Sequence, residues 1–499
     1  MARLTDIPNE ILEHIFTYVS DINHPDIFAL RVVSKRFNDI AAPLRVRNWS
    51  DDGDYGHYST SDSIVTLDRF ALELLRYPEL RSRVRSLKFT WIQTPHDHDP
   101  ARVGLRSANL ELLAKAAEEA LPDLAATTDL CQQIRRVWDD GLAVLVLVWT
   151  TNLESLTLTI PQIPRGGDWH YYNQLVTLRL AKQLALRFVT RHSRPTQALP
   201  LAKLRHLDFR YWGIGNWNAV HEINMRQLTP FLYFPSLKNL KITCVGEDYE
   251  DLDDLDASGQ DSYSMRYPKR TSPIESVVLA TQHITMHGLR SVLGACKSLK
   301  VFRAEFAETG DESSTRPQHS CSLLARCLID HASSLQELDL PMYKYDTDWI
   351  HNFDQLPQCF HQKLTKLRKL SIPVSFNSIH EIHLSGYERT WITPSRLPPS
   401  IEYLKLYDSL RPILKECKLG KSAFVTELGK ALGVVTSIVA KAGEKGRLSQ
   451  LRYIDCAEVV RDDPTMKWVE ELKQTAKERG VQVLLGDYDP LEDVIMEDL

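Results

Sequence analysis

The chain begins with two apolar stretches that decide its N-terminal fold: Leu4-Thr-Asp-Ile-Pro-Asn-Glu-Ile-Leu-Glu-His-Ile-Phe16 and Asp26-Ile-Phe-Ala-Leu-Arg-Val-Val-Ser-Lys-Arg-Phe37. Pro8 favours the start of a helix, because an N–H in the first turn has no partner within the helix. Apolar residues then recur at helical spacing, namely Ile11, Leu12, Ile15, Phe16 and Val19, and Ile27, Leu30, Val33, Phe37 and Ile40. Two short helices cannot bury this surface alone, so the sequence predicts a partner.

These stretches resemble the F-box, the helical module by which receptor subunits of Skp/cullin/F-box ubiquitin ligases hold a small adaptor. Ile7 stands where the family usually has leucine. The resemblance implies that a Skp-family adaptor, and through it a cullin, binds here. The adaptor contacts implied are Ile7, Pro8, Ile11, Leu12, Ile15, Phe16, Leu30, Val33 and Phe37. The alternative is a helical cap on the body that follows.

Length and charge limit the remaining possibilities. With 499 residues, 43% of them hydrophobic and 25% charged, the chain is of the globular class, and its size favours several domains or a repeat array. The net charge of -5, without a long Lys or Arg run, disfavours nucleic acid or an anionic membrane as partner.

Cysteines and hydropathy indicate the compartment. Eight cysteines are scattered without a C-x-x-C pair, which disfavours a zinc framework and a secreted disulfide scaffold. Asp6 and Glu10 stand where a signal peptide needs an apolar run, and residues 142–149 are too few to span a bilayer. We expect a soluble protein of the cytoplasm, the nucleus or both.

A short phrase recurs along the body: an apolar residue followed three and five positions later by two more, as in Leu153/Leu156/Leu158. The other phrases are Val84/Leu87/Phe89, Leu204/Leu207/Phe209, Leu237/Leu240/Ile242, Ile274/Val277/Leu279, Leu299/Phe302/Ala304, Leu335/Leu338/Leu340, Leu367/Leu370/Ile372, Ile401/Leu404/Leu406 and Leu451/Ile454/Cys456. Positions two apart share one face of a strand, and helical patterns lie between the phrases. This alternation predicts parallel strands.

The residues between the apolar positions are largely polar, for example Ser155, Thr157, His206 and Asp208. A doubly wound sheet would be apolar on both faces, so one face of this sheet must meet solvent or a partner. The phrases resemble degenerate leucine-rich repeats of the fungal type. The fold class predicted is α/β: a curved leucine-rich-repeat-like solenoid, parallel strands inside and helices outside, preceded by a small all-α F-box.

The predicted domains are an F-box at residues 4–49, a linker and capping helix at 50–80, and a leucine-rich-repeat-like domain at 81–485. That domain contains an acidic insertion at 246–270, and residues 486–499 form an acidic tail. Low apolar content predicts that the insertion is flexible. Both acidic segments are either solvated loops or attract a basic partner.

No motif for chemistry is complete. His221-Glu222 and His380-Glu381 lack the second histidine of a zinc-protease helix, and residues 96–99 read as an exposed loop between prolines. Phosphate-binding and dinucleotide-binding glycine loops and a G-x-S-x-G elbow are absent from the sequence. The sequence therefore predicts no catalytic residue, no metal site and no cofactor, and an enzyme within the body is disfavoured.

Aromatic residues gather just past the ends of several predicted strands. They are Trp91, Tyr211, Trp212, Trp217, Tyr343, Tyr345 and Tyr407. The C-terminal ends of parallel strands share one rim, where binding sites are commonly built, and Tyr and Trp often anchor interfaces. These residues are candidates for substrate binding. The alternative is that their rings pack on neighbouring repeats.

The function predicted is that of a non-catalytic substrate receptor. The F-box would bind the ligase adaptor, while the repeats would bind a protein substrate of unknown identity for ubiquitin transfer by other subunits. The alternative is an F-box scaffold that binds the adaptor without promoting degradation. A small molecule assisting substrate binding is a further possibility that the resemblance leaves open.

Overall fold

The structure is a computed structural model of the chain, which divides into two compact units, Met1–Pro273 and Ile274–Leu499. The residues that it describes are 7–22, 26–51, 66–89, 105–160, 175–190, 199–211, 223–243, 245–246, 265–281, 286–306, 321–340, 363–374, 394–395, 397–408, 421–443, 446–459 and 467–486.

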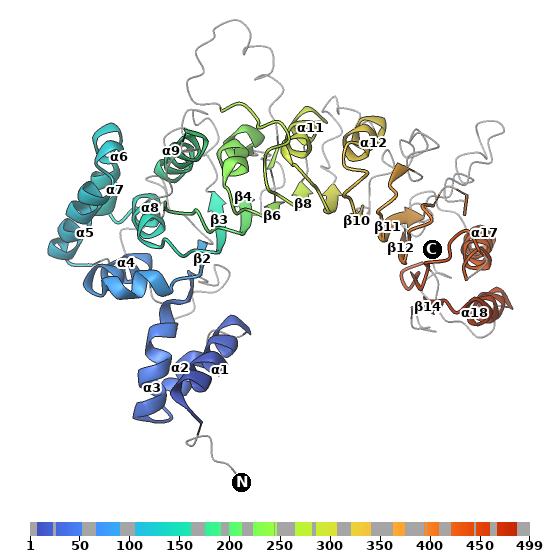
Figure 1. Cartoon of the computed structure of the whole chain (residues 1–499), viewed down its shortest axis with the longest axis horizontal. Helices are drawn as coiled ribbons and strands as arrows, with labels where there is room; N and C mark the ends of the chain where they lie inside the picture. Colours follow the sequence, from blue (N-terminus) through green and yellow to red (C-terminus); the bar gives the residue numbers. More distant parts are fainter. Residues whose placement is uncertain are drawn as a thin grey trace, which may run out of the picture. The chain divides into compact units, whose positions relative to one another are not determined.

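The first unit begins with a helical bundle (Figure 1). Its elements are α1 (Asn9–Ile22), α2 (Asp26–Arg31), α3 (Lys35–Ala41) and the 3-10 helix η2 (Ala42–Val46). Pro8 precedes α1, and its carbonyl accepts the Leu12 N–H at 3.0 Å. Ser34 caps α3, because its hydroxyl accepts the Phe37 N–H at 3.1 Å. Local sequence therefore sets both helix starts.

The rest of the first unit is a parallel sheet with helical connections. The helices are α4 (Leu67–Arg76), η3 (Pro78–Arg83), α5 (Ser107–Ala120), α6 (Pro122–Thr127), α7 (Leu130–Arg135), α8 (Asp139–Trp149), α9 (Val176–Thr190) and η6 (Met225–Tyr233). The strands are β1 (Asn48–Ser50), β2 (Ser86–Phe89), β3 (Ser155–Ile160), β4 (His206–Tyr211) and β6 (Asn239–Thr243), paired in that order. Two further strands, β5 (Ile223–Asn224) and β7 (Val245–Gly246), pair separately.

The second unit repeats the plan. Its strands, all parallel and paired in chain order, are β8 (Ser276–Thr281), β9 (Val301–Phe306), β10 (Glu337–Asp339), β11 (Lys369–Val374), β12 (Tyr403–Asp408), β13 (Tyr453–Asp455) and β14 (Gln482–Leu484). Its helices are α11 (Met286–Ala295), α12 (Cys321–Ile329), α17 (Lys421–Ala440) and α18 (Lys467–Arg479). The helices α11 and α12 pack side by side, as do α17 and α18 (Figure 1).

Each of the ten apolar phrases overlaps a strand or extends a few residues beyond its ends, and every one of their residues is buried. The residues between them are partly exposed, as the alternating burial of β2 shows. Each sheet therefore has one apolar face toward its helices and one open face. The predicted parallel sheet is confirmed, while the curved solenoid stays a prediction.

A repeated hydrogen-bond pattern sets the register. The carbonyl of the residue before a strand accepts the first two N–H groups of the next repeat, as the Arg85 carbonyl does from Glu154 at 2.8 Å and Ser155 at 3.0 Å. The Arg47 carbonyl does the same for Arg85 and Ser86. Arg47 directly follows the helical bundle, so the bundle runs into the first turn of the sheet.

The sheet is longer at both ends than the phrases indicate. β1 lies across residues predicted as F-box and linker, and β14 follows the last phrase. Both strands are short. Val46 and Trp49 are buried on the apolar side of β1, and Val481 is buried on that of β14. A helix, α4, lies within the predicted linker and capping helix at 50–80, and its capping role stays a prediction. Residues 247–264 of the predicted insertion and residues 487–499 of the predicted tail lie outside the described residues.

Candidate interaction surfaces

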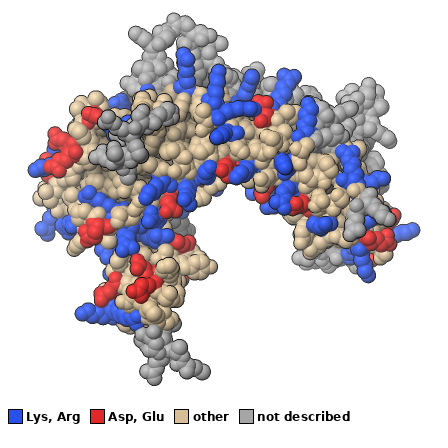
Figure 2. Space-filling model, in the orientation of Figure 1, with Lys and Arg blue, Asp and Glu red and all other residues tan. Residues whose placement is uncertain are grey.

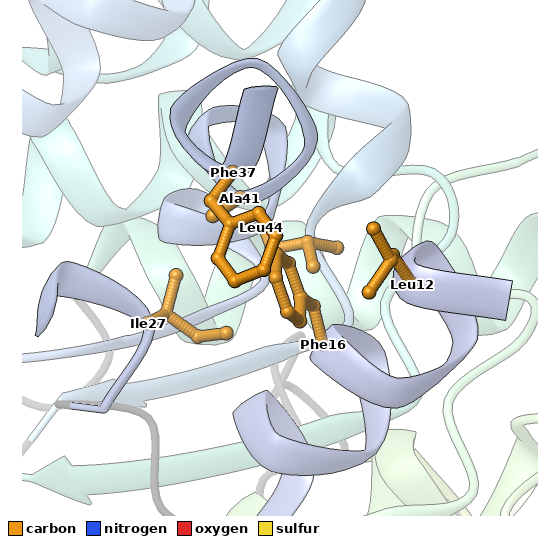
Figure 3. Close-up of a cluster of buried hydrophobic side chains, with 6 residues drawn as sticks. All are labelled: Leu12, Phe16, Ile27, Phe37, Ala41 and Leu44. Atoms are coloured by element: carbon orange, nitrogen blue, oxygen red, sulfur yellow. The ribbon is translucent and has the colours of Figure 1, made fainter. Parts of the chain in front are cut away.

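The helical bundle has its own closed core. Leu12, Phe16, Ile27, Phe37, Ala41 and Leu44 form it (Figure 3). The rings of Phe16 and Phe37 meet edge to face, with centroids 5.1 Å apart. Leu12, Phe16 and Phe37, expected as adaptor contacts, therefore have no surface to offer a partner. Both core and contact residues recur at helical spacing, so spacing alone could not separate them.

The remaining predicted contacts lie at or near the surface. Ile11 is 51% exposed, Ile15 42% and Val33 64%. Pro8 is exposed as well, whereas Ile7 and Leu30 are half-buried against the bundle core. Of the nine predicted contacts, the structure brings these six to the outside wholly or in part.

Sequence reasoning missed four exposed apolar residues of the bundle. Tyr18, Ile22, Phe28 and Val32 are 68%, 68%, 44% and 86% exposed. Tyr18 and Ile22 continue a stripe that starts at Ile11 and Ile15, since spacings of four, three and four residues follow one helix face. Leu12 and Phe16 form a second stripe on the same helix. Helical spacing alone does not separate the exposed stripe from the buried one.

The outer apolar surface thus consists of Ile11, Ile15, Tyr18 and Ile22 on α1 and Phe28, Val32 and Val33 on α2 and the turn after it. Figure 2 shows uncharged surface on the bundle beside its acidic and basic side chains. Burying one such aliphatic or aromatic side chain contributes about 1.5–3 kcal/mol. Exposed apolar residues in this number on so small a unit mark an interaction site.

The bundle is joined tightly to the sheet. Trp49 of β1 stacks on Phe70 of α4, with ring centroids 5.0 Å apart, and its ring lies 5.6 Å from that of Phe89 of β2. Arg45 of η2 pairs with Glu73 of α4. Because β1 also pairs with β2, no loop separates the last turn of the bundle from the sheet. The predicted polar linker follows β1 rather than preceding the sheet.

The open face of the first unit is rich in hydrogen-bond donors. It carries Asn48, Ser50, Ser86, Lys88, Ser155, Thr157, His206, Asp208, Arg210, Asn239 and Lys241. Asp208 accepts hydrogen bonds from Arg210 at 2.5 and 2.9 Å and lies 3.9 Å from the Lys241 ammonium. This face therefore combines hydroxyls with cationic side chains.

The open face of the second unit is aromatic and internally paired. The Tyr407 hydroxyl donates to Asp339 at 2.7 Å, across the intervening strand β11, and Arg303 lies 3.4 Å from the same carboxylate. The Tyr403 hydroxyl donates to Asp455 at 3.0 Å. Burial, and then the bond to Asp455, raises the pKa of Tyr403 to about 12. Burial and Asp339 also raise the pKa of Tyr407.

Two of the seven residues of the predicted aromatic rim are among the described residues. Tyr407 lies inside β12 on the open face, and Tyr211 is the last residue of β4, so neither follows the end of its strand. The other five, Trp91, Trp212, Trp217, Tyr343 and Tyr345, lie outside the described residues. Whether the rim binds a substrate stays a prediction.

Among the described residues, potential metal ligands are scattered and several thiols are buried. The described residues contain no cluster of His, Cys, Asp and Glu that could hold a metal ion. Burial raises the pKa of the Cys296 and Cys456 thiols to about 12, which keeps them protonated and unreactive. Within the same described ranges, no helix has both the length and the apolar character to cross a membrane.

Comparison with known proteins agrees with the bundle geometry. Residues 4–46 match the family model F-box-like, close to the predicted range of 4–49. No curated protein matches the chain. The chain therefore carries an F-box-like domain at residues 4–46, and domains of this family generally bind adaptors of the Skp type. The match ends where the sheet begins, so it assigns no family to the body.

Proposed function

We propose that the protein is the non-catalytic substrate receptor of a Skp/cullin/F-box ubiquitin ligase. The observation that carries this proposal is an F-box-like domain with a closed core and a second, exposed apolar surface. A domain whose apolar residues served only its own folding would not leave such an apolar surface exposed. The F-box contributes adaptor binding, and the cullin joins through the adaptor.

The outer apolar surface is suited to docking into an apolar groove of a partner or against a partner helix. Ile11, Ile15, Tyr18 and Ile22 lie along one face of α1, at the spacing by which an amphipathic helix docks into an apolar groove. Phe28, Val32 and Val33 extend the surface onto α2 and the turn after it. These seven residues, with Pro8, are the proposed adaptor contacts, and the core residues Leu12, Phe16 and Phe37 hold them in place.

The body supplies a different kind of surface. Its parallel strands expose long polar open faces, and connecting loops and open faces of repeat sheets are common binding sites. We assign substrate recognition to this body, with leucine-rich-repeat-like architecture as part of the proposal. The tight join through Trp49 means that an adaptor on the bundle would hold the first strands at a set distance from the cullin.

Co-purification tests the proposal. The tagged full-length chain is expected to capture a Skp-type adaptor and a cullin. The double variant I15E/V33E places charge on the outer apolar surface and should lose both proteins. The variant L112E is the matched control, since Leu112 on α5 is 55% exposed but lies outside the bundle.

Two outcomes would change the conclusion. If neither the native chain nor L112E captures the adaptor, the proposed function is wrong. If the adaptor is captured but no protein accumulates when the receptor is removed from cells, the chain acts as a scaffold that binds the adaptor without promoting degradation.

A further inference from the structure

The register of the first unit places chemically similar residues in rows across the open face of its sheet. One row consists of Ser50, Lys88, Thr157, Asp208 and Lys241. The row before it consists of Asn48, Ser86, Ser155, His206 and Asn239. Together with Arg210, these described residues include three cationic side chains and one carboxylate. Most of the others are hydroxyls or amides, which can donate hydrogen bonds.

A third row borders this face, formed by the residue directly before each strand: Arg47, Arg85, Glu154, Arg205 and Lys238. Arg85 lies 3.5 Å from Glu154. Arg205 is exposed, and the register places it beside Lys238 on the neighbouring strand, about 4.8 Å away along the sheet. This row therefore carries more cationic side chains than carboxylates.

The carboxylate on the open face is already engaged. Asp208 lies between Arg210 and Lys241, and its Oδ1 atom is buried. It therefore orients two cations rather than opposing an incoming anion. The Asn239 amide nitrogen lies 2.9 Å from His206 Nδ1, so these two neighbours in the row contact each other. Figure 2 shows Lys and Arg side chains prominent where β2, β3 and β4 lie.

The second unit lacks this excess of positive charge. On the described part of its open face, Arg303, Lys369 and Lys405 are balanced by Glu337, Asp339 and Asp455. Several of these charges pair directly, as Lys369 does with Glu337 at 2.7 Å. The same repeat plan thus carries a basic face in one unit and a neutral face in the other, which makes the basic face a property of specific side chains.

We infer that the basic face of the first unit binds an extended acidic segment of the protein substrate, with carboxylates about four residues apart. This inference rests on the proposed function and names its substrate class. Lys88 on β2 and Lys241 on β6 are three strand spacings apart, about 14 Å, and residues four apart in an extended peptide are separated by about the same distance. Hydroxyl and imidazole donors lie between them.

The spread of the charges favours this ligand over two others. A single phosphate requires cations converging on one point, whereas these lie along four strands. Single-stranded nucleic acid usually needs aromatic side chains for base stacking, and the described residues of this open face include no Trp or Phe. An acidic peptide needs only spaced donors on an extended surface.

The test measures binding of a fluorescein-labelled peptide of about twelve residues, with glutamates four apart in a Ser/Gly background, to the full-length chain by anisotropy. The native protein should bind it, with affinity falling as salt rises. The variant R205E/K241E should weaken binding about tenfold or more. The matched control R368E/K405E changes the equivalent positions of the second unit, the residue directly before β11 and the third residue of the neighbouring strand β12, and should alter affinity about twofold or less.

Each alternative result overturns the inference. Equal weakening by both double variants would show non-specific attraction, and a phosphoserine peptide or an oligonucleotide binding while the glutamate peptide does not would identify another ligand class. Melting curves and adaptor capture are measured on the same variants. A chain that captures the adaptor but not the peptide refutes this inference alone, whereas loss of adaptor capture by the native chain refutes the proposed function.

Discussion

The helical bundle and the sheet that follows it expose opposite kinds of surface. The bundle leaves Ile11, Tyr18, Val32 and other apolar side chains in solvent although its core is complete. The open face of the first unit's sheet presents hydroxyls, amides and cations, and its apolar residues all point to the helices. The difference indicates that the two surfaces serve different partners, one bound by apolar burial and one by charge and hydrogen bonds.

A substitution in the bundle's core should have the largest effect on stability and on adaptor binding. Phe16→Ala removes a side chain that is only 2% exposed and in edge contact with Phe37, so it should cost about 3–5 kcal/mol of the bundle's stability. Adaptor capture should fail because the bundle unfolds, as chemical denaturation and limited proteolysis would show. A folded Phe16→Ala bundle that still fails to bind would return Phe16 to the contact surface.

The junction between the two regions is the next test. Trp49→Ala removes the stack on Phe70 and the contact with Phe89, and we expect a loss of about 3 kcal/mol. Since β1 pairs with β2, both the bundle and the first strands should become less protected in hydrogen exchange. Loss of protection in the bundle alone would mean that the two regions fold independently.

A change on the bundle's outer surface should affect binding without affecting stability. I15E/V33E is expected to weaken adaptor binding by about 2 kcal/mol or more, because truncating or charging an interface anchor typically has that effect. The melting temperature should stay within a few degrees of the native value, since both side chains are already exposed. A large drop in melting temperature would show that this surface packs inside the protein.

The smallest effect concerns the aromatic open face of the second unit. Tyr403→Phe removes the bond to Asp455, at a cost of about 1 kcal/mol. Because the folded pKa of Tyr403 is raised to about 12, the unfolded chain loses the proton first, so stability falls between about pH 10 and 12. Melting curves should show a shallower fall for Tyr403→Phe than for the control Tyr453→Phe. Equal slopes would exclude this linkage.

The sheet was largely predictable from the sequence. Every phrase such as Leu204/Leu207/Phe209 is buried as expected, because alternation with period two can be satisfied only by a strand with one apolar face. β1 and β14 escaped prediction because each lacks one apolar residue of the phrase: Asp51 follows Val46 and Trp49, and Gly480 precedes Val483 and Leu485. Their pairing depends on neighbours that are distant in sequence, such as Ser86 for Asn48.

The site on the bundle was predictable only as a region. Helical spacing identified Ile11, Leu12, Ile15 and Phe16 as apolar, but burial of Leu12 and Phe16 depends on where Phe37 and Leu44 close the core. The remaining side chains of α1, Tyr18 and Ile22 included, are left outside by that closure. Helix packing decides which stripe becomes core and which stays on the surface. Hydrophobic periodicity alone does not distinguish the two.

By itself, the sequence determined the type of each segment: amphipathic helices near the N-terminal end, then parallel strands with one polar face, because local periodicity follows directly from backbone geometry. The tertiary structure alone decided which residues meet. Register placed Lys88 and Lys241 on one row, and brought Tyr407 across β11 to Asp339. Such neighbours depend on the length and path of every connection between strands, which no local pattern contains.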